Sequence, residues 1–416
     1  MALTIGLHRT AHSEAGTRAH LAAPVALAAI LALLIPLMLA GPSNLTSDES
    51  LYLAEAYNIA HGHGATYPSG EAITHRAPLY PALLAPAIRV GGLDSAYAVT
   101  KTIIALNVVL VLLIAWRMGG AVAGSVAGVA AAGSAYLRGL GTTLYLDPAQ
   151  CTAMLLALLF VQQAMKHPGW RSWIAAGAVS GIAFLVKESA MQWAPLGALV
   201  WLVLPAQRRR SGAIGALAYT VSFGLVAGSW PAYVWLKTSE AFLIGDSPAL
   251  AVAVTVAGAV AVAVFAVTVH AWPRLPRSAR SSAASFAMPL AVAIIFAWWA
   301  FVLYGLTAHS QWGYPNDYAT NLPEYLTRVA PAAQPFLLIV LAWAWCMARA
   351  CSGDERHRLI AISAILFGPF AVFIANRGLQ LRDALPLVYL SYVVLGMAVA
   401  DALHAAEQRA ESASWR

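Results

Sequence analysis

Asp48 and Glu49 form the acidic pair whose setting is best suited to chemistry. Asp48, Tyr52, Glu55 and Ile59 follow one another at spacings that put them on a single face of a helix. A carboxylate that faces a cavity can accept the proton of an attacking hydroxyl group. The structural alternative is that acids in the first turn of a helix interact favourably with its dipole. Asp48 is therefore the candidate general base, with Glu49 and Tyr52 as candidate binding residues beside it.

A basic pair, His75 and Arg76, precedes Pro78. Arginine is well suited to phosphate because its planar guanidinium can donate two parallel hydrogen bonds. The structural alternative is a simple helix start, since proline is common in the first turn of a helix. We interpret Arg76, and with it His75, as a candidate phosphate-binding pair.

Three more charged residues, Asp147, Lys187 and Arg382, lie close to the ends of apolar segments. Asp147 precedes Pro148 and could simply cap a helix. Lys187 could pair with the neighbouring Glu188 or extend toward the membrane surface. Arg382 could anchor a helix end. Each has a sufficient structural explanation alone, but all three fall on the same membrane face once the helices are laid out.

The composition identifies a membrane protein. Of the 416 residues, 60% are hydrophobic and 10% are charged, whereas soluble domains have about 45–50% apolar and about 25% charged residues. This excludes a conventional soluble enzyme, a disordered chain and a coiled coil. The net charge of +7 comes without a basic and aromatic stripe or a compact nucleic-acid module. We therefore attribute it to membrane orientation and expect no nucleic-acid partner.

Apolar segments long enough to span a bilayer recur along the whole chain and predict about twelve helices. No polar region of domain size separates them, so residues 1–416 are expected to form a single all-α polytopic membrane domain. The segments are 21–40, 96–117, 119–137, 143–165, 172–187, 189–205, 212–236, 248–271, 285–308, 329–350, 358–376 and 384–402.

Basic residues predict the orientation. With residues 1–20 in the cytoplasm, the groups Arg208–Arg210 and Arg274–Arg280 both fall on the cytoplasmic side, as the positive-inside rule requires. The tail 403–416 is then cytoplasmic as well. Most acidic residues, Asp48 and Asp147 included, fall on the outer side. We expect a multi-pass protein of the plasma (inner) membrane whose active site faces the periplasm or the cell exterior.

The first outer loop, 41–95, is long and patterned. Thr46 and Glu49 fit a capping box that starts a helix, and Gly62 ends it. A second amphipathic stretch, Leu79–Val90, follows Pro78. We expect two short juxtamembrane helices along the outer interface, in a loop whose length is typical of function. A later outer loop, 309–328, is rich in Trp and Tyr and is either an interfacial aromatic belt or a platform for a sugar or lipid.

The sequence identifies no cofactor. His61, His63 and His75 could be drawn as a metal site, but their spacing is not that of a typical ligand set. We therefore assign no metal ligands, and dependence on a divalent cation stays open.

Motifs in order along the chain resemble those of the GT-C glycosyltransferases. The branch is the one that holds the protein O-mannosyltransferases and the lipid A aminoarabinose transferases, in which an Asp-Glu pair opens one juxtamembrane helix and a basic residue before a PPLYP-like run opens the next. The matching segments here are Asp48–Tyr52, Gly62–Gly64, Arg76–Pro81, Asp147–Pro148, Gly181–Glu188 and Arg382–Leu387. The last three resemble the family's second outer-loop acid, its G-x-x-x-L-x-K stretch and its late R-Y-x-L-P stretch.

The resemblance implies transfer of a hexosyl or pentosyl group from a polyprenyl-phosphate donor to a glycan, lipid or protein hydroxyl, outside the cytoplasm. Asp48 would match the family's general base. Arg76, Lys187 and Arg382 would be candidates for the lipid phosphate, and Asp147 for a second polar contact. We expect inversion at the anomeric carbon, because the acceptor would attack from the face opposite the phosphate.

Departures from the family pattern leave the sugar and the acceptor open. The family's Pro-Pro is Ala77-Pro78 here, and its Arg-Tyr is Arg382-Asp383. Within these 416 residues we identify no segment that resembles the soluble C-terminal domain of the aminoarabinose transferases or the large insert of the eukaryotic mannosyltransferases. The competing interpretation is a secondary transporter of a small or lipid-linked solute, which twelve helices would also fit. Transporters usually show repeat symmetry and a site near the midplane, and we find no clear repeat.

Overall fold

The computed structural model describes residues 25–43, 45–74, 76–166, 169–204, 209–239, 336–376 and 381–414. Within these ranges the regular structure is helical, and the one other pairing is an isolated β-bridge between Thr66 and Ala72. The all-α prediction is therefore confirmed. The expected helices 248–271 and 285–308 and the aromatic loop 309–328 lie outside the described residues.

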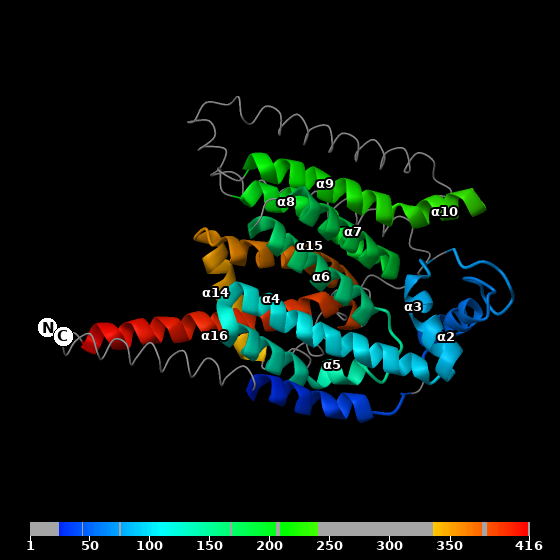
Figure 1. Ribbon diagram of the computed structural model, residues 1–416, viewed down its shortest axis with the longest axis horizontal. Coiled ribbons are helices and arrows are strands. Elements are labelled where there is room, and N and C mark those ends of the chain that lie inside the picture. Colours follow the sequence, from blue (N-terminus) through cyan, green and yellow to red (C-terminus); the bar gives the residue numbers. More distant parts are fainter. Residues whose placement is uncertain are drawn as a thin grey trace.

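The helices form a bundle in which long apolar elements lie side by side (Figure 1). Helix α16 packs on α4, α6 on α7, and α7 on α9. The elements of the bundle are Val25–Leu39, α4 (Ser95–Gly133), α5 (Ala135–Leu140), α6 (Asp147–Lys166), α7 (Trp170–Val186), η1 (Glu188–Trp193), α8 (Leu196–Val203), α9 (Arg209–Ala227), α10 (Ser229–Thr238), α14 (Phe336–Cys351), α15 (Glu355–Asn376), η4 (Leu381–Ala384) and α16 (Leu385–Ser414).

The described helices support a multi-pass membrane protein. Four of them, within Ser95–Gly133, Asp147–Lys166, Gly212–Thr238 and Leu385–Ala413, are long and apolar enough to cross a bilayer. A fifth span would be formed by Leu337–Cys351 and Glu355–Phe367, which meet at a bend of 118°. The described part of the chain thus accounts for only some of the expected twelve spans.

Helix α4 contains the break that the sequence placed near Gly119. Gly120 has φ 83°, a left-handed conformation that glycine adopts without strain. Beyond Gly120 the chain turns back on itself. The contact that shows this is between Gly124 and Trp116: a Cβ built on Gly124 would lie 2.8 Å from the Cβ of Trp116. The segment after Gly120 is rich in Ala and Gly, whose small size allows helices to approach closely. The two separate helices expected over 96–117 and 119–137 are therefore confirmed as two arms that meet at Gly120.

The region after α7 differs from the prediction of a continuous helix over 189–205. Lys187 is extended (φ −152°, ψ 130°), η1 is a 3₁₀ segment, and α-helix resumes only at Leu196 after Pro195. Proline lacks an N–H and fits the start of a helix better than its interior. A second difference is that α16 continues to Ser414, beyond the expected end at residue 402.

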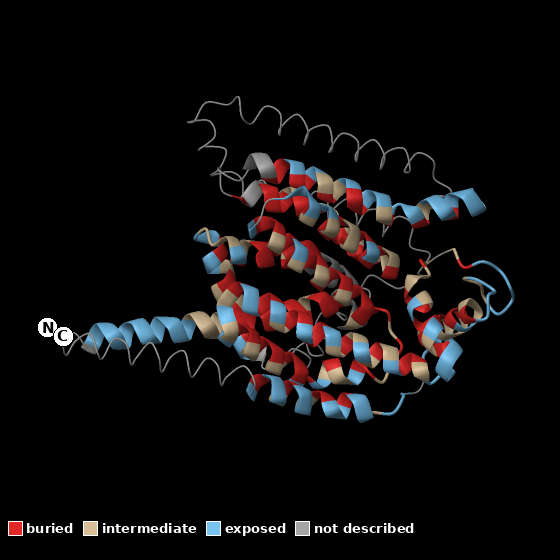
Figure 2. Cartoon of the chain, in the orientation of Figure 1, coloured by how far each residue is buried: buried red, intermediate tan, exposed pale blue. Residues whose placement is uncertain are grey.

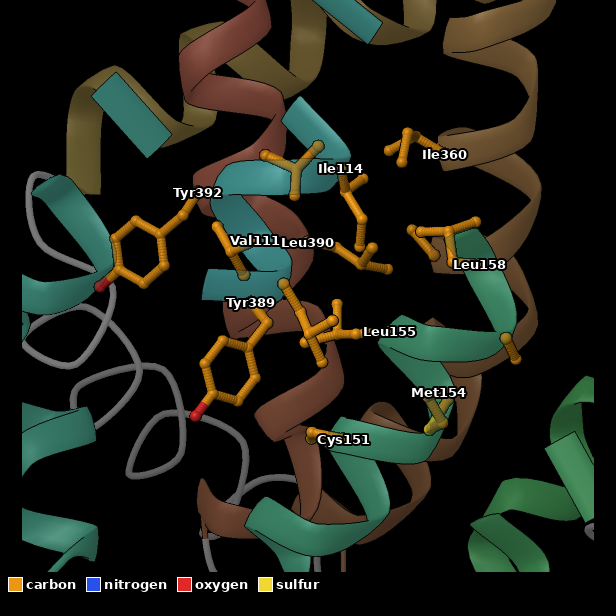
Figure 3. Packing of buried hydrophobic residues seen from close by; sticks show 14 of the residues in the cluster. Val111, Ile114, Cys151, Met154, Leu155, Leu158, Ile360, Tyr389, Leu390 and Tyr392 are labelled. Carbon is orange, nitrogen blue, oxygen red and sulfur yellow. The ribbon is translucent and has the colours of Figure 1, made fainter. Parts of the chain in front are cut away.

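Burial follows the pattern of a membrane bundle. Red and blue residues alternate around most helices in Figure 2, and Leu106, Val109, Leu113 and Trp116 form an exposed apolar stripe on α4. Such a stripe suits contact with lipid rather than water. One part of the main apolar core lies where α4, α6, α15 and α16 meet. Figure 3 shows Val111, Ile114, Leu155, Leu158, Ile360, Tyr389 and Leu390 packed there.

The two expected juxtamembrane helices are present. They are α2 (Ser47–Ala60) and α3 (Leu79–Gly91), and they lie together at the end of the bundle away from the C-terminal end of α16 (Figure 1). Tyr52 of α2 meets Tyr80 of α3 edge to face, with ring centroids 5.8 Å apart. The pair has its own small apolar core, which also includes Leu144 and Leu146 before α6.

Candidate active site

Asp48 lies in the first turn of α2, at the surface of the α2/α3 pair. The predicted capping box is confirmed, since Thr46 accepts a hydrogen bond from the Glu49 N–H while Glu49 accepts one from the Thr46 N–H. The capping box fixes the start of α2, and therefore the backbone position from which the Asp48 side chain extends. Its side chain is 35% exposed, and its Oδ2 accepts a hydrogen bond of 2.7 Å from Nη2 of Arg382.

Glu49 is buried and bonded to backbone through both oxygens. Its Oε2 accepts from the Thr46 N–H at 2.9 Å, and its Oε1 accepts from the Leu144 N–H at 2.7 Å. The second bond ties the beginning of α2 to the segment that leads into α6. Glu49 thereby links the element that carries Asp48 to the element that carries Asp147.

Asp147 and Lys187 form a short ion pair. Lys187 Nζ lies 2.6 Å from Asp147 Oδ1, and the Asp147 side chain is only 3% exposed. Two further bonds place these elements: Asn107 of α4 donates to the Pro148 carbonyl at 2.8 Å, and Gln150 of α6 donates to Ser189 of η1 at 2.7 Å. The break after α7 allows Lys187 to leave the helix and reach α6.

Arg382 joins the two acids. Besides its bond to Asp48, its Nε lies 3.9 Å from Asp147 Oδ2, an ion-pair distance too long for a hydrogen bond. The guanidinium carbon stands 3.6 Å from the ring centroid of Tyr145, close enough for a cation–π interaction. Lys187, Asp147, Arg382 and Asp48 thus form a chain of alternating charge, which we call the α2-end cluster.

Arg76 and Tyr52 form a second unit beside this cluster. Arg76 donates a hydrogen bond to the Tyr52 hydroxyl, and its guanidinium carbon lies 5.5 Å from the centroid of the Tyr52 ring. Burial raises the pKa of Tyr52; Arg76 opposes this, and Asp147 and Asp48 add to it. Tyr52 is therefore close to both Arg76 and the acids and holds its proton as a neutral hydroxyl.

Glu55, which is buried, and Glu188, which is partly buried, lie near Arg76. The Glu55 side chain is 3% exposed, and its Oε1 has no hydrogen-bond partner. Burial raises the pKa of Glu55 to about 7, against the opposing effect of Arg76. Burial also raises the pKa of Glu188, and hydrogen bonds from backbone, including that of Ala77, oppose it.

A shallow apolar pocket of about 240 Å³ adjoins Arg76. It lies between the start of α3, the end of α7 and the start of α10. Its lining residues are Ala77, Pro78, Leu79, Ala82, Leu185, Ser229 and Trp230.

The structure thus brings together the expected site residues that it describes, namely Asp48, Glu49, Tyr52, Arg76, Asp147, Lys187 and Arg382. His75 lies outside the described residues. Sequence reasoning missed Tyr145 as a partner of Arg382, although its position two residues before Asp147 was a usable signal. It placed Glu55 on the Asp48 face of α2 without giving it a role.

The described side chains do not form an evident metal centre. Among the residues in the described ranges, no group of three or more His, Cys, Asp or Glu side chains is arranged to hold an ion. His61, one of the three histidines that could be drawn as ligands, has its Nδ1 2.8 Å from the Tyr57 carbonyl oxygen and its ring against that of Tyr57.

Comparison with known proteins gives both a family match and a fold. Residues 75–235 match the family model described as dolichyl-phosphate-mannose-protein mannosyltransferase. No curated protein matches the chain. The family match begins just before Arg76 and includes Asp147 and Lys187.

Solved structures match over most of the chain. ArnT from Cupriavidus metallidurans bound to undecaprenyl phosphate superimposes with TM-score 0.57 at 16% identity, covering 91% of this chain and 59% of that one. The oligosaccharyltransferase AglB from Archaeoglobus fulgidus, in complex with an inhibitory peptide and a dolichol-phosphate, gives TM-score 0.59 at 16% identity, with 94% and 51% covered. The Archaeoglobus fulgidus oligosaccharyltransferase in complex with Zn and sulfate gives 0.62 at 17%, with 91% and 49% covered.

These structures are of GT-C membrane glycosyltransferases, so the chain has the GT-C fold. It spans between about half and three fifths of the length of the matched chains.

Proposed function

We propose that this GT-C protein transfers a sugar from a polyprenyl-phosphate donor to a hydroxyl group of a glycan, lipid or protein acceptor. The observation that carries the proposal is the α2-end cluster. Asp48, Asp147, Lys187 and Arg382 come from separate elements and meet at one end of an apolar helix bundle. At a membrane surface, the carboxylates of such a cluster can accept the proton of the acceptor hydroxyl, and its cations can bind the phosphate of the donor.

Asp48 is the proposed general base. It is the more accessible of the two acids, with 35% of its side chain exposed against 3% for Asp147. A base must approach the proton that it removes within hydrogen-bond reach. Asp147 is held between Lys187 and Arg382, so we assign it the role of orienting those two cations. It thereby acts as the second polar residue of the site beside Asp48.

Cations would stabilise the leaving group. In the proposed step the acceptor oxygen loses its proton to Asp48 and forms the new bond to the anomeric carbon. The bond from that carbon to the phosphate oxygen breaks, and polyprenyl phosphate departs with the electron pair. Arg76, Lys187 and Arg382 would stabilise the charge that grows on this phosphate. Attack opposite the phosphate gives inversion.

The apolar pocket beside Arg76 suits the first part of a polyprenyl chain. Its lining includes Ala77 and Trp230 and is apolar except for Ser229. A phosphate held by Arg76 would place the attached lipid against this surface. A polyprenyl-phosphate ligand would agree with the structures of ArnT and AglB, which contain undecaprenyl phosphate and dolichol-phosphate.

Two residues near Asp48 are assigned supporting roles. Both oxygens of Glu49 accept backbone N–H bonds, so we propose that it positions Asp48 rather than contacting substrate directly. Tyr52 accepts a hydrogen bond from Arg76 and would orient that guanidinium for the phosphate. His75 precedes Arg76 in the chain and is kept as a candidate contact to the donor.

The proposed site lies on the non-cytoplasmic side of the plasma membrane, with both termini inside. The support is the distribution of basic residues along the sequence. The GT-C fold favours this enzyme over the transporter, since the matched structures are of glycosyltransferases. Hexosyl and pentosyl donors are equally compatible with the described side chains.

A donor panel tests the proposal. The purified protein in lipid nanodiscs is incubated with hexosyl and pentosyl polyprenyl phosphates and a mixed set of acceptors, and mass spectrometry follows the donor and the product. We expect release of polyprenyl phosphate with one donor and a product of inverted configuration. Absence of turnover with every donor, or solute transport in sealed vesicles without sugar transfer, would contradict the proposal.

Asp48→Asn tests the assignment of the base. Because the amide cannot accept the proton, transfer should fall about 10²–10⁴-fold. Asp94→Asn is the matched control, since Asp94 precedes α4 at the same end and its side chain forms no capping bond. An Asp48→Asn protein that folds and retains normal turnover would exclude Asp48 as the base.

A further inference from the structure

The Arg382 guanidinium lies between two carboxylates, those of Asp48 and Asp147. Its Nη2 is 2.7 Å from Asp48 Oδ2, and its Nε is 3.9 Å from Asp147 Oδ2. Asp48 in α2 and Asp147 in α6 are far apart in the sequence. The Arg382 guanidinium, which lies between them, holds the two acids close to each other. A metal ion bridging the same acids would need the oxygens that Arg382 now faces.

The side chains that the structure describes around Arg382 do not fit a divalent ion in that place. Mg²⁺ and related ions require about six oxygen ligands in a regular shell. Asp147 Oδ1 already lies 2.6 Å from Lys187 Nζ, and its Oδ2 faces Arg382. In the described ranges no third acid or His completes a ligand set with Asp48 and Asp147. A divalent ion placed there would also meet two positive side chains at contact distance, and like charges repel.

The guanidinium, in contrast, is held as a built component. Its side chain is 14% exposed, it carries a bond to Asp48, and it stacks against Tyr145 at 3.6 Å. Arginine stays charged at all physiological pH values and carries five N–H donors in a rigid plane. Pairing with two acids therefore leaves the same group able to donate to a phosphate.

We propose that Arg382 is the resident cation of this site and that sugar transfer requires no divalent metal ion. This inference rests on the proposed function for its catalytic part. Arg382 orients Asp48, balances the charge of Asp147 and presents a fixed positive charge to the leaving phosphate. These are tasks that a bridging metal ion would otherwise perform.

Direct metal binding tests the inference without relying on activity. The purified, chelator-treated protein is titrated with Mn²⁺ and free Mn²⁺ is followed by electron paramagnetic resonance. We expect no stoichiometric site in the wild-type protein. A single wild-type Mn²⁺ site that is lost in Asp48→Asn would overturn the inference.

Activity in the presence of chelator gives the second test. Wild-type transfer should be the same in EDTA and in Mg²⁺ or Mn²⁺. Arg382→Ala should lose about 100-fold or more, as when one electrostatic donor is removed from a catalytic site, and Arg382→Lys should retain more activity because it keeps a positive charge. Arg89→Gln is the matched control, since Arg89 bonds to the Ala60 carbonyl at the same end of the molecule.

The two proposals fail in different ways. Turnover that depends on added metal, or an Arg382→Ala protein with full activity in EDTA, would overturn the role of Arg382 while leaving glycosyl transfer intact. Absence of turnover under every condition would remove the proposed function, and the Mn²⁺ titration would still decide whether a metal ion or Arg382 holds the two acids. Thermal unfolding and size-exclusion profiles show whether each variant is folded.

Discussion

The described part of the molecule has two clusters of alternating charge, one at each end of the bundle, and they are built differently. The α2-end cluster consists of Asp48, Asp147, Lys187 and Arg382. At the other end, near the α14–α15 connection (Figure 1), lies a second cluster of Arg349, Asp354, Arg356, His357 and Asp401, which we call the α15 cluster. Each contains two acids bound by several cations.

The α15 cluster is local in sequence. Asp354 accepts from the Arg356 N–H at 3.0 Å and lies 3.0 Å from Arg356 Nη2 and 3.1 Å from His357 Nδ1. All of its members except Asp401 lie within one short stretch, and the Arg349 and Arg356 side chains are 45% exposed. Contacts of this kind cap a helix and secure a turn. They need no substrate to explain them.

The α2-end cluster requires the whole fold. Arg382 and Asp48 are 334 positions apart in sequence, and Asp147 and Lys187 are 40 apart. Each side chain comes from a different element, and Asp147 is almost fully buried. A cluster that only ends a helix can be made from neighbours, whereas one that must contact several parts of a substrate draws on several elements. This difference is the reason to place the chemistry at the α2 end.

The largest expected contrast in stability comes from removing one cation at each end. Lys187→Met leaves the buried Asp147 without its closest partner and should destabilise the protein by about 3–5 kcal/mol. Arg349→Met removes an exposed pair to Asp354 and should cost less than about 1 kcal/mol. Thermal or denaturant unfolding in detergent measures both.

Restoration distinguishes charge from packing. Adding Asp147→Asn to Lys187→Met removes the uncompensated carboxylate, so most of the lost stability should return. If Lys187→Met and Arg349→Met were equally mild, the two clusters would be energetically alike and the distinction between them would fail.

The second contrast is in pH dependence, because Glu55 at the α2 end and Asp354 at the other end have pKa values shifted in opposite directions. Burial raises the pKa of Glu55 from 4.5 to about 7. The folded protein then keeps a proton that the unfolded chain has released, so this contribution to stability decreases as the pH rises from 4.5 to about 7. The full effect would be about 3 kcal/mol.

For Asp354 the sign is reversed. Burial acts to raise its pKa, but hydrogen bonds from Arg356 and His357 outweigh burial and lower it below 3.8. Its contribution to stability is therefore present above that value and is lost as the pH falls below it.

Glu55→Gln tests the contribution of Glu55. It should remove the loss of stability between pH 5 and pH 7, seen as a smaller change in the unfolding temperature. Glu71→Gln, an exposed acid of the same loop, is the control, and an unchanged pH profile in Glu55→Gln would refute the assignment.

The sequence predicted the features that depend on neighbouring residues. The capping box at Thr46 and Glu49, the second short helix from Leu79 and the break near Gly119 all follow from local backbone preferences, and all are confirmed. The prediction of a continuous helix over 189–205 was wrong, because the chain forms a 3₁₀ segment first and an α-helix begins only after Pro195. Hydropathy alone does not distinguish a 3₁₀ segment from an α-helix.

Contacts across long sequence separations could not be predicted from pattern. The sequence named Asp48, Asp147 and Arg382 as candidates, but their pairing depends on how α2, α6 and η4 pack. Nothing in the spacing indicated that Arg382 would lie between the two acids or stack on Tyr145. Glu49 was likewise expected to contact substrate, and its bond to the Leu144 N–H becomes visible only once the loop before α6 is placed.

The smallest expected effect isolates the capping role of Asp354. Asp354→Ala removes the acceptor for the Arg356 N–H at the start of α15 and should cost about 1 kcal/mol, the usual value of a lost N-cap. Asp354→Ser can still accept that bond and should recover most of it. Because the α15 cluster is assigned no contact with substrate, both variants should transfer sugar at the wild-type rate below their unfolding temperature. A folded Asp354→Ala protein whose transfer is reduced as strongly as that of Asp48→Asn would mean that the two ends are coupled. The bond from Arg356 to the Met118 carbonyl, beside the Gly120 turn, would be a route for such coupling. The division of the molecule into a structural end and a chemical end would then be wrong.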